Sequence, residues 1–218
     1  AKTGGRAEID PALLDEVTSM VEWPVAVLGN FEQRFLDVPQ EALISSMKGH
    51  QKYFHVVDAE GKLMPHFITI SNIDSTDINQ VREGNERVIR PRLSDAEFFW
   101  NQDRKQKLSV HIEALKKVVF QKQLGTIYDK SERVSALAGD IAEQLGGNKQ
   151  EAQRAGQLSR CDLLSEMVNE FPELQGIMGR EYALESSEPP EVAAAIYEHY
   201  LPRFAGDALP EGAAGNIL

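Results

Sequence analysis

The sequence has only one cysteine and no long apolar run, and each shortage excludes a class of protein. Cys161 has no partner for an internal disulfide, which excludes a disulfide-stabilised scaffold and favours a reducing cytoplasm. No apolar run approaches the roughly 20 residues that a membrane-spanning helix needs. The first six residues lack the apolar core of a secretory signal, and no initiator methionine is present. We therefore expect a cytoplasmic chain that is a piece of a longer protein.

Signatures of common enzymes are also missing. The sequence contains no Walker-type phosphate loop, no Rossmann glycine fingerprint, no HExxH and no GxSxG. Its five histidines are scattered, without a pair at i and i+4 that could hold a metal from one helix face. We expect no catalytic residue and no metal site in this chain.

What is present is the composition of a globular protein with an uneven charge distribution. The 218 residues are 42% hydrophobic and 26% charged, which fits one large domain or two small ones. The net charge of −11 argues against a freestanding nucleic-acid binder. However, residues 81–130 carry eleven basic and seven acidic side chains, a local charge of +4 between two acidic flanks. Because charges are screened over about 8 Å, this stretch can act as a local positive face. A solvated helix face of mixed charge explains it equally well.

Apolar spacing predicts an α+β protein in two parts. A small mixed α/β unit occupies residues 1–95, and its expected elements are helices at 9–22 and 39–49 and three strands at 25–28, 53–57 and 67–70, the last two in a hairpin. A helical unit occupies residues 96–205, without further strands and with expected helices at 110–125, 131–145, 148–168 and 189–200. Residues 206–218 are rich in glycine, alanine and proline and are expected to be loosely ordered.

Two basic runs are the strongest local feature. The first has four arginines within eleven residues (Arg82, Arg87, Arg90 and Arg92) and is followed by the aromatic run Phe98–Trp100. The second is Arg104-Lys105-Gln106-Lys107. Arginine forks bind phosphate oxygens in bidentate fashion, and aromatic rings stack on unpaired bases. We favour a core position for the aromatic residues. For the arginines, phosphate binding and ion pairs of Arg90 and Arg92 with Asp95 and Glu97 remain equally open.

One pair of residues at an apolar helix position could be mistaken for a reactive site. The thiol of Cys161 is expected to be buried and inert rather than nucleophilic. Its neighbour Asp162 would need a partner if it were buried, and we expect either an ion pair with Arg160 or a contact with a helix end.

Several longer motifs, in the same order, make the chain resemble the beta subunit of bacterial glycyl-tRNA synthetase. The resemblance covers about residues 17–218, and the motifs that carry it are VEWP at 21–24, MKGHQKYF at 47–54, GNE at 84–86 with RPRL at 90–93, DAEFF at 95–99, QLGT at 123–126, EFPELQG at 170–176 with MGR at 178–180, and YLPRFAGD at 200–207. Proteins of that family are much longer, so the chain resembles only a central piece.

The resemblance implies a division of labour between subunits. In that family the alpha subunit holds the class II site that activates glycine with ATP and Mg²⁺, while beta supplies tRNA binding within an α2β2 assembly in the cytoplasm. This chain would then be part of a glycine–tRNA ligase, with no cofactor of its own. Its expected partners are the alpha subunit and tRNA-Gly, and no membrane association is expected. The family's middle region is likened to the HD-type phosphohydrolase fold, but here Cys161 replaces the histidine of the HD pair.

These observations lead to one main hypothesis and two alternatives. The main hypothesis is that the chain helps to hold tRNA-Gly, and the candidate contact residues are Arg87, Arg90, Arg92, Arg104, Lys105 and Lys107. The first alternative is a scaffold at the interface between subunits, without direct tRNA contact. The second is an HD-type phosphohydrolase, which the absence of a histidine and aspartate ligand set disfavours.

Overall fold

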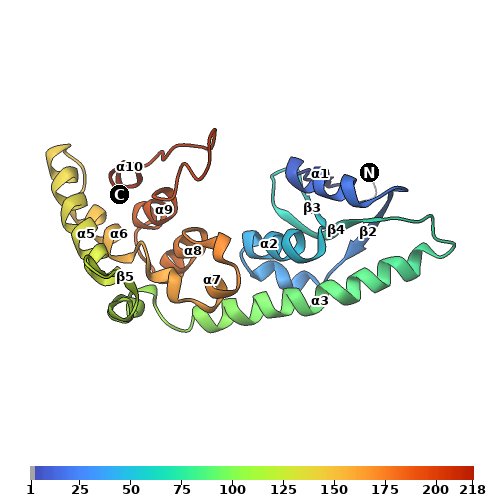
Figure 1. The fold of residues 1–218 in the computed structure, drawn as a ribbon, viewed down its shortest axis with the longest axis horizontal. Helices are drawn as coiled ribbons and strands as arrows, with labels where there is room; N and C mark the ends of the chain where they lie inside the picture. Colours follow the sequence, from blue (N-terminus) through green and yellow to red (C-terminus); the bar gives the residue numbers. More distant parts are fainter. Residues whose placement is uncertain (1–2) are drawn as a thin grey trace. The chain divides into compact units, whose positions relative to one another are not determined.

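The computed structural model describes residues 3–218, and Ala1 and Lys2 lie outside the described residues. Contacts divide the chain into two compact units, one ending at Phe99 and the other starting at Trp100. The division falls inside helix α3 (Ile78–Asp103), four residues after position 95, where the sequence analysis placed it. The α+β class is confirmed, because the first unit combines a sheet with helices and the second is mainly helical (Figure 1).

The first unit is a four-stranded antiparallel sheet with helices. Its elements are β1 (Arg6–Ala7), α1 (Pro11–Met20), β2 (Val25–Asn30), the 3₁₀ helix η1 (Gln33–Asp37), α2 (Gln40–Gln51), β3 (Phe54–Val57), β4 (Leu63–Ser71) and the part of α3 up to Phe99. The strand order is β1-β3-β4-β2. The three predicted strands and the hairpin are confirmed. The sequence analysis missed β1, because two residues are too few for a period-2 pattern.

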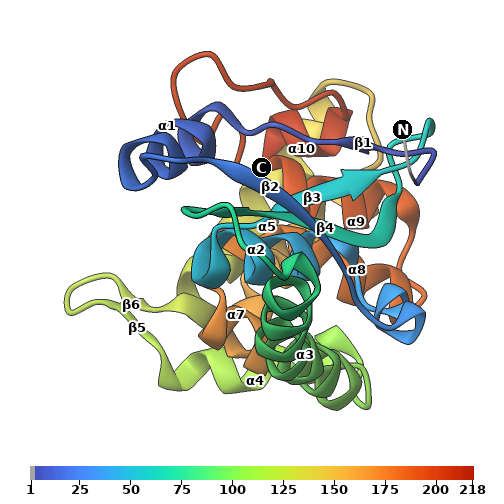
Figure 2. The same cartoon turned by 90° about the vertical axis from the view of Figure 1, so that its right-hand side faces the viewer.

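The sheet of this unit is covered on both faces. Helix α1 lies on one side of the sheet, and α2 and α3 lie on the other (Figures 1 and 2). Leu13 and Val17 of α1 pack on Phe54. On β4, Phe67 lies opposite Gly29 in the register and stacks on Tyr53, with 4.5 Å between ring centroids. A β-carbon at Gly29 would overlap the Phe67 ring, so the glycine leaves room for the phenyl group.

Helix α3 accommodates a proline in its interior. Pro91 is exposed and lies within the 26 residues of the helix. Proline has no N–H to donate to the carbonyl four residues earlier, here that of Arg87. Because both residues are exposed, water can bind the freed carbonyl. The buried side of α3 keeps the helix in place through the fully buried Ile89 and Leu93.

The second unit is built mainly from helices. Its elements are η2 (Leu108–Val110), α4 (His111–Ala114), η3 (Leu115–Lys117), β5 (Val119–Gln121), β6 (Gly125–Thr126), α5 (Ile127–Gln144), α6 (Lys149–Leu158), η4 (Cys161–Leu164), α7 (Glu166–Glu170), η5 (Pro172–Leu174), α8 (Ile177–Glu185), α9 (Pro190–Glu198) and α10 (Ala213–Ile217). Helices α5 and α6 pack closely, and α9 contacts α6, α8 and α10 (Figure 1). The predicted helices at 131–145 and 189–200 correspond to α5 and α9.

Two predictions for this unit were wrong. The expected helix at 110–125 is a series of short turns followed by the β5–β6 hairpin, so strands do occur in the unit that was predicted to have none. Branched Val118 and Val119 favour extended backbone, and Gly125 adopts the positive φ of 88° at the hairpin. The expected helix at 148–168 ends at Leu158. The hydroxyl of Ser165 then donates to the Asp162 carbonyl and accepts from the Val168 N–H, which starts α7.

The C-terminal segment is more ordered than expected. Residues 206–218 were predicted to be loose, but Ala213–Ile217 form α10, which packs on α9. Ile217 and Leu218 lie against buried Ala138, Ala142 and Ala152. A short apolar segment that finds small side chains to pack on gains order that composition does not reveal. No helix within residues 3–218 combines the length and apolarity that crossing a bilayer requires.

Candidate nucleic-acid interface

The three candidate arginines of the first unit lie on α3 and are all exposed. Arg87, Arg90 and Arg92 point away from the buried side of the helix, which contains Ile89 and Leu93. With 3.6 residues per turn, Arg87 and Arg90 share one side of the helix, while Arg92 lies about 140° around the axis from Arg87. The helix therefore presents two arginines in one direction and the third in another.

Ion pairs occupy only one of these three arginines. Arg90 Nε donates to the Glu32 carboxylate at 2.6 Å. Glu97 pairs with Arg34 of η1. In the part of the chain that the structure describes, the ion pairs of Arg90 and Arg92 with Asp95 and Glu97 that the sequence left open do not form. Within residues 3–218, Arg87 and Arg92 have no ion-pair partner. Their guanidinium groups are available to an external anion.

The second basic run follows at the end of α3 and belongs to the second unit. Arg104, Lys105 and Lys107 are all exposed. The Arg104 guanidinium lies 5.7 Å from the centroid of the Trp100 ring, and Lys105 Nζ donates to the Gln102 side chain at 2.7 Å. These weak surface contacts leave the positive charges unneutralised.

The aromatic run divides between core and surface. Trp100 is buried and stacks on Tyr182 with a centroid distance of 5.3 Å, as predicted for a core residue. Phe98, in contrast, is 55% exposed, so the prediction that the whole run is buried was wrong. Three consecutive helical residues point in three directions about 100° apart, and one of them must leave the buried side.

The sequence analysis missed a second group of arginines, which surrounds two tyrosines of the second unit. The guanidinium of Arg160 lies 4.6 Å from the Tyr200 ring centroid and donates to the Tyr200 hydroxyl at 2.7 Å. Arg180 and Arg203 lie 5.0 and 5.6 Å from the centroid of Tyr197. Arg203 also donates to the carbonyl of Gln175. These residues are spread over about forty positions, and the motifs at 178–180 and 200–207 contain some of them without indicating that they meet.

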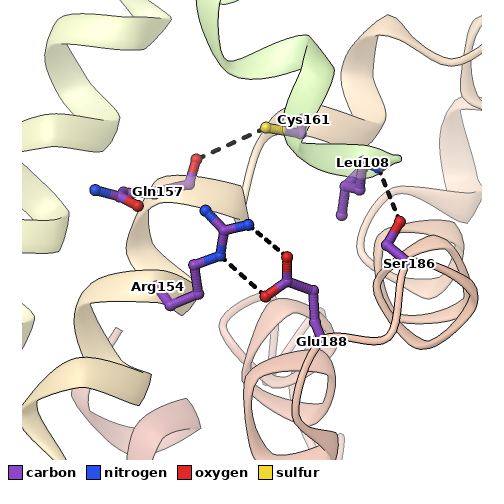
Figure 3. A network of polar contacts seen from close by, with 6 residues as sticks. All are labelled: Leu108, Arg154, Gln157, Cys161, Ser186 and Glu188. Carbon is purple, nitrogen blue, oxygen red and sulfur yellow. Dashed lines mark hydrogen bonds and ion pairs between the residues drawn. The ribbon is translucent and has the colours of Figure 1, made fainter. Parts of the chain in front are cut away.

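A polar network inside the second unit connects α6 and η2 with the segment that follows α8 (Figure 3). Arg154 of α6 binds the Glu188 carboxylate with two nitrogens, and its Nε donates at 2.9 Å. The Glu188 side chain is only 14% exposed. Ser186 Oγ accepts the Leu108 N–H at 2.9 Å, and the Cys161 thiol points to the Gln157 carbonyl at 3.7 Å. Burial raises the pKa of the Cys161 thiol to about 12, as expected for an inert cysteine.

We expect Arg154→Met to lower the free energy of unfolding of this unit by about 2 kcal/mol, because it leaves a largely buried carboxylate without its charged partner. Urea denaturation measures this change. The double variant Arg154→Met/Glu188→Gln is the control, since it removes both charges and should recover most of the loss. Equal losses in the single and double variants would contradict a role for the ion pair.

Asp162 is fully buried and accepts a backbone hydrogen bond. Its Oδ2 accepts the N–H of Gly176 at 2.6 Å, immediately before α8. Two partners were expected, a helix end or Arg160. The contact with the start of α8 is present, and no ion pair with Arg160 forms among the described residues. Its Oδ1 has no partner within residues 3–218. Burial raises the pKa of this carboxyl to about 6.

A raised carboxyl pKa makes stability fall as pH rises. Between about pH 4 and pH 6 the folded chain keeps a proton on Asp162 that the unfolded chain has lost, so Asp162 lowers stability above pH 6 by on the order of 3 kcal/mol relative to pH 4. Asp162→Asn has no proton to lose at this position. The free energy of unfolding of the variant minus that of the unchanged protein should therefore increase by about 3 kcal/mol between pH 4 and pH 6. Urea midpoints at pH 4, 5, 6 and 7.5 measure it, and a difference that is independent of pH would contradict the burial of a charge.

Among the described residues, histidine, cysteine, aspartate and glutamate side chains nowhere gather in a group of three or more that could bind a metal ion. What the surface offers instead is exposed positive charge on α3 and on the segment that follows it.

Comparison with known proteins gives one consistent result. The family model of the glycyl-tRNA synthetase beta subunit matches residues 1–218. The chain is 61% identical to the glycine–tRNA ligase beta subunit of Hahella chejuensis and 59% identical to that of Pseudomonas putida, each over 214 residues. It is 60% identical over 212 residues to the beta subunit of Chromohalobacter salexigens. These alignments cover 97–98% of this chain but only 31% of each relative.

Proposed function

The chain belongs to the glycyl-tRNA synthetase beta subunit family, and from this premise we propose that it helps to bind tRNA-Gly and to hold it for attachment of glycine. In this proposal the alpha subunit uses ATP and Mg²⁺ to activate glycine, and this chain contributes contacts to RNA rather than reacting groups. The assembly is a cytoplasmic hetero-oligomer of two alpha and two beta subunits.

One observation carries the proposal: exposed cations lacking carboxylate partners are concentrated in one segment of an acidic protein. Arg87 and Arg92 on α3 have no ion-pair partner among the described residues, and Arg104, Lys105 and Lys107 follow in the exposed segment. Proteins recognise double-helical RNA largely through its shape, its phosphates and its 2′-hydroxyls, which requires positive groups on a rigid support. Within the first unit, the part of α3 with buried Ile89 and Leu93 provides such a support for Arg87 and Arg92.

A crosslinking map of the assembled enzyme with tRNA-Gly tests the proposal. We expect crosslinked peptides from residues 81–130, and fewer of them when salt is raised, because phosphate contacts weaken with ionic strength. Peptides around Arg6 and Lys62, which are also exposed and basic but lie elsewhere in the sequence, serve as the control. Crosslinks distributed equally over both sets would contradict a localised contact.

Exposed apolar side chains support a second candidate, a scaffold between subunits. Val88 and Phe98 are 48% and 55% exposed on the same helix that carries the arginines. Exposed apolar side chains mark a surface that another protein covers when they form a contiguous patch, and this alternative requires Val88 and Phe98 to belong to one. Under this alternative, the alpha subunit would protect α3 from hydrogen exchange, and tRNA would add no further protection.

A further inference from the structure

A small cavity with basic walls lies in the second unit, apart from the candidate residues discussed above. It measures about 150 Å³ and is lined at its polar side by Lys130, Ser131, Ser159, Arg160 and His199. These residues come from the start of α5, the turn after α6 and the end of α9. We call this cavity the basic pocket. None of the six candidate tRNA contacts lines it.

Several polar atoms at the basic pocket have no hydrogen-bond partner among the described residues. Ser131 is only 4% exposed, and its Oγ is unpartnered. Both ring nitrogens of His199 are buried and unpartnered as well. Native proteins pair nearly all of their buried donors, with protein, water or ligand. A cavity that gathers such atoms on its walls is therefore a place where a polar ligand gains hydrogen bonds without breaking existing ones.

The charge at the pocket is positive. Burial and the neighbouring Arg160 lower the pKa of Lys130, and the same two causes lower the pKa of His199 to about 4. The positive charge of Arg133 also lowers the pKa of Lys130. Within residues 3–218 neither Lys130 nor Arg160 forms an ion pair.

The groups that face these cations do not cancel the charge. Arg160 donates to the neutral Tyr200 hydroxyl, and Lys130 Nζ lies 4.4 Å from the Phe120 ring centroid. The carboxylate of Asp162 attracts Arg160 and offsets part of its charge, whereas only burial and the cations Arg160 and Arg133 shift the pKa of Lys130. The two neighbouring cations, Lys130 and Arg160, repel each other and would be stabilised by an anion placed between them.

We propose that the basic pocket binds a single phosphate group. A tetrahedral phosphate presents acceptor oxygens in several directions, and the walls offer an ammonium, a guanidinium, an imidazole N–H and the free hydroxyl of Ser131 as donors. A cavity of about 150 Å³ admits a group of this size and is too small for a whole nucleotide. The phosphate can be a free anion or part of an RNA chain. The proposal stands independently of the tRNA contacts on α3.

Binding of radiolabelled inorganic phosphate to the assembled protein tests the proposal, with chloride added to hold the ionic strength constant. We expect one saturable site per chain, with occupancy visible below about 10 mM phosphate, and a rise in the melting temperature with phosphate. Lys130→Met should weaken binding at least tenfold. Ser131→Ala should weaken it severalfold without lowering the melting temperature in chloride, because the lost hydroxyl has no partner. Lys117→Met, an exposed lysine of the same unit outside the pocket, is the control and should bind normally.

The outcomes separate clearly. Absence of a saturable site, or equal phosphate affinity in all three variants, would overturn the proposal. Displacement of the bound phosphate by tRNA-Gly supports it and identifies the RNA backbone as the source of the group. Retention of the phosphate in the presence of tRNA-Gly also supports it and identifies a free anion as the ligand.

Discussion

Reversing the charges of Arg104 and Lys107 to glutamate should weaken binding of tRNA-Gly by the assembled enzyme on the order of 10- to 100-fold. Each side chain is exposed, so neither change removes a buried contact. If each contacts one phosphate, the slope of log K against log salt should become shallower by roughly 1 per residue. Equilibrium binding measured from 50 to 300 mM salt gives both quantities.

The matched control for this double variant reverses Arg6 and Lys62, two exposed cations outside residues 81–130. Both double variants change the formal net charge from −11 to −15, so a general electrostatic effect would weaken both equally. We expect the control to keep its salt slope. An unchanged affinity and slope in the Arg104 and Lys107 variant would remove these residues from the RNA interface.

Replacing Gly156 by alanine should destabilise the second unit by about 2–3 kcal/mol. Helices α5 and α6 approach each other so closely here that the added β-carbon would overlap the backbone of α5. A β-carbon at Gly156 would lie 2.6 Å from the Cα and 2.8 Å from the N of Ser135. Backbone atoms in a packed helix cannot rotate away as a side chain can. The two helices would have to separate, and the buried alanines at their contact would lose packing.

Gly139→Ala provides the control at the same helix pair. A β-carbon at Gly139 would meet side-chain atoms of Gln153, the nearest of them Cγ at 2.5 Å, and these atoms move away when Gln153 takes another rotamer. Alanine also has a higher helix propensity than glycine, by about 1 kcal/mol. We therefore expect Gly139→Ala to lie within about 1 kcal/mol of the unchanged protein in urea denaturation. Equal losses at both glycines would contradict the close approach at Ser135.

Local chemistry explains which parts of the fold the sequence could predict. Asp10 caps α1 and Pro11 occupies its first turn, while Asn148 caps α6. Thr126 and Asp129 form a reciprocal capping box at the start of α5, a local signal that the predicted start at residue 131 did not use. Each of these signals lies within four residues of the helix end it defines. The turns between residues 108 and 118 and the short helices after Leu158 depend instead on tertiary contacts, and periodicity alone joined them into long helices.

For the candidate site, too, local sequence patterns indicate some properties, while others depend on residues that are far apart in the sequence. Exposure of Arg87, Arg92 and Lys107 could be expected from the apolar spacing around them. The pairing of Arg90 with Glu32 joins residues 58 positions apart, which no local pattern encodes. The basic pocket likewise combines side chains from three separate helices or turns, and its unpartnered atoms are visible only once the chain is folded.

The central claim is that this chain contributes contacts to tRNA and leaves bond formation to another subunit. Steady-state kinetics of the assembled enzyme carrying the Arg104 and Lys107 reversals test it most directly, with glycine-dependent ATP–pyrophosphate exchange measured beside glycylation of tRNA. We predict that exchange stays within about twofold of the unchanged enzyme while kcat/KM for tRNA falls by 10-fold or more. A parallel fall of both activities, or an unchanged kcat/KM for tRNA, would contradict the account.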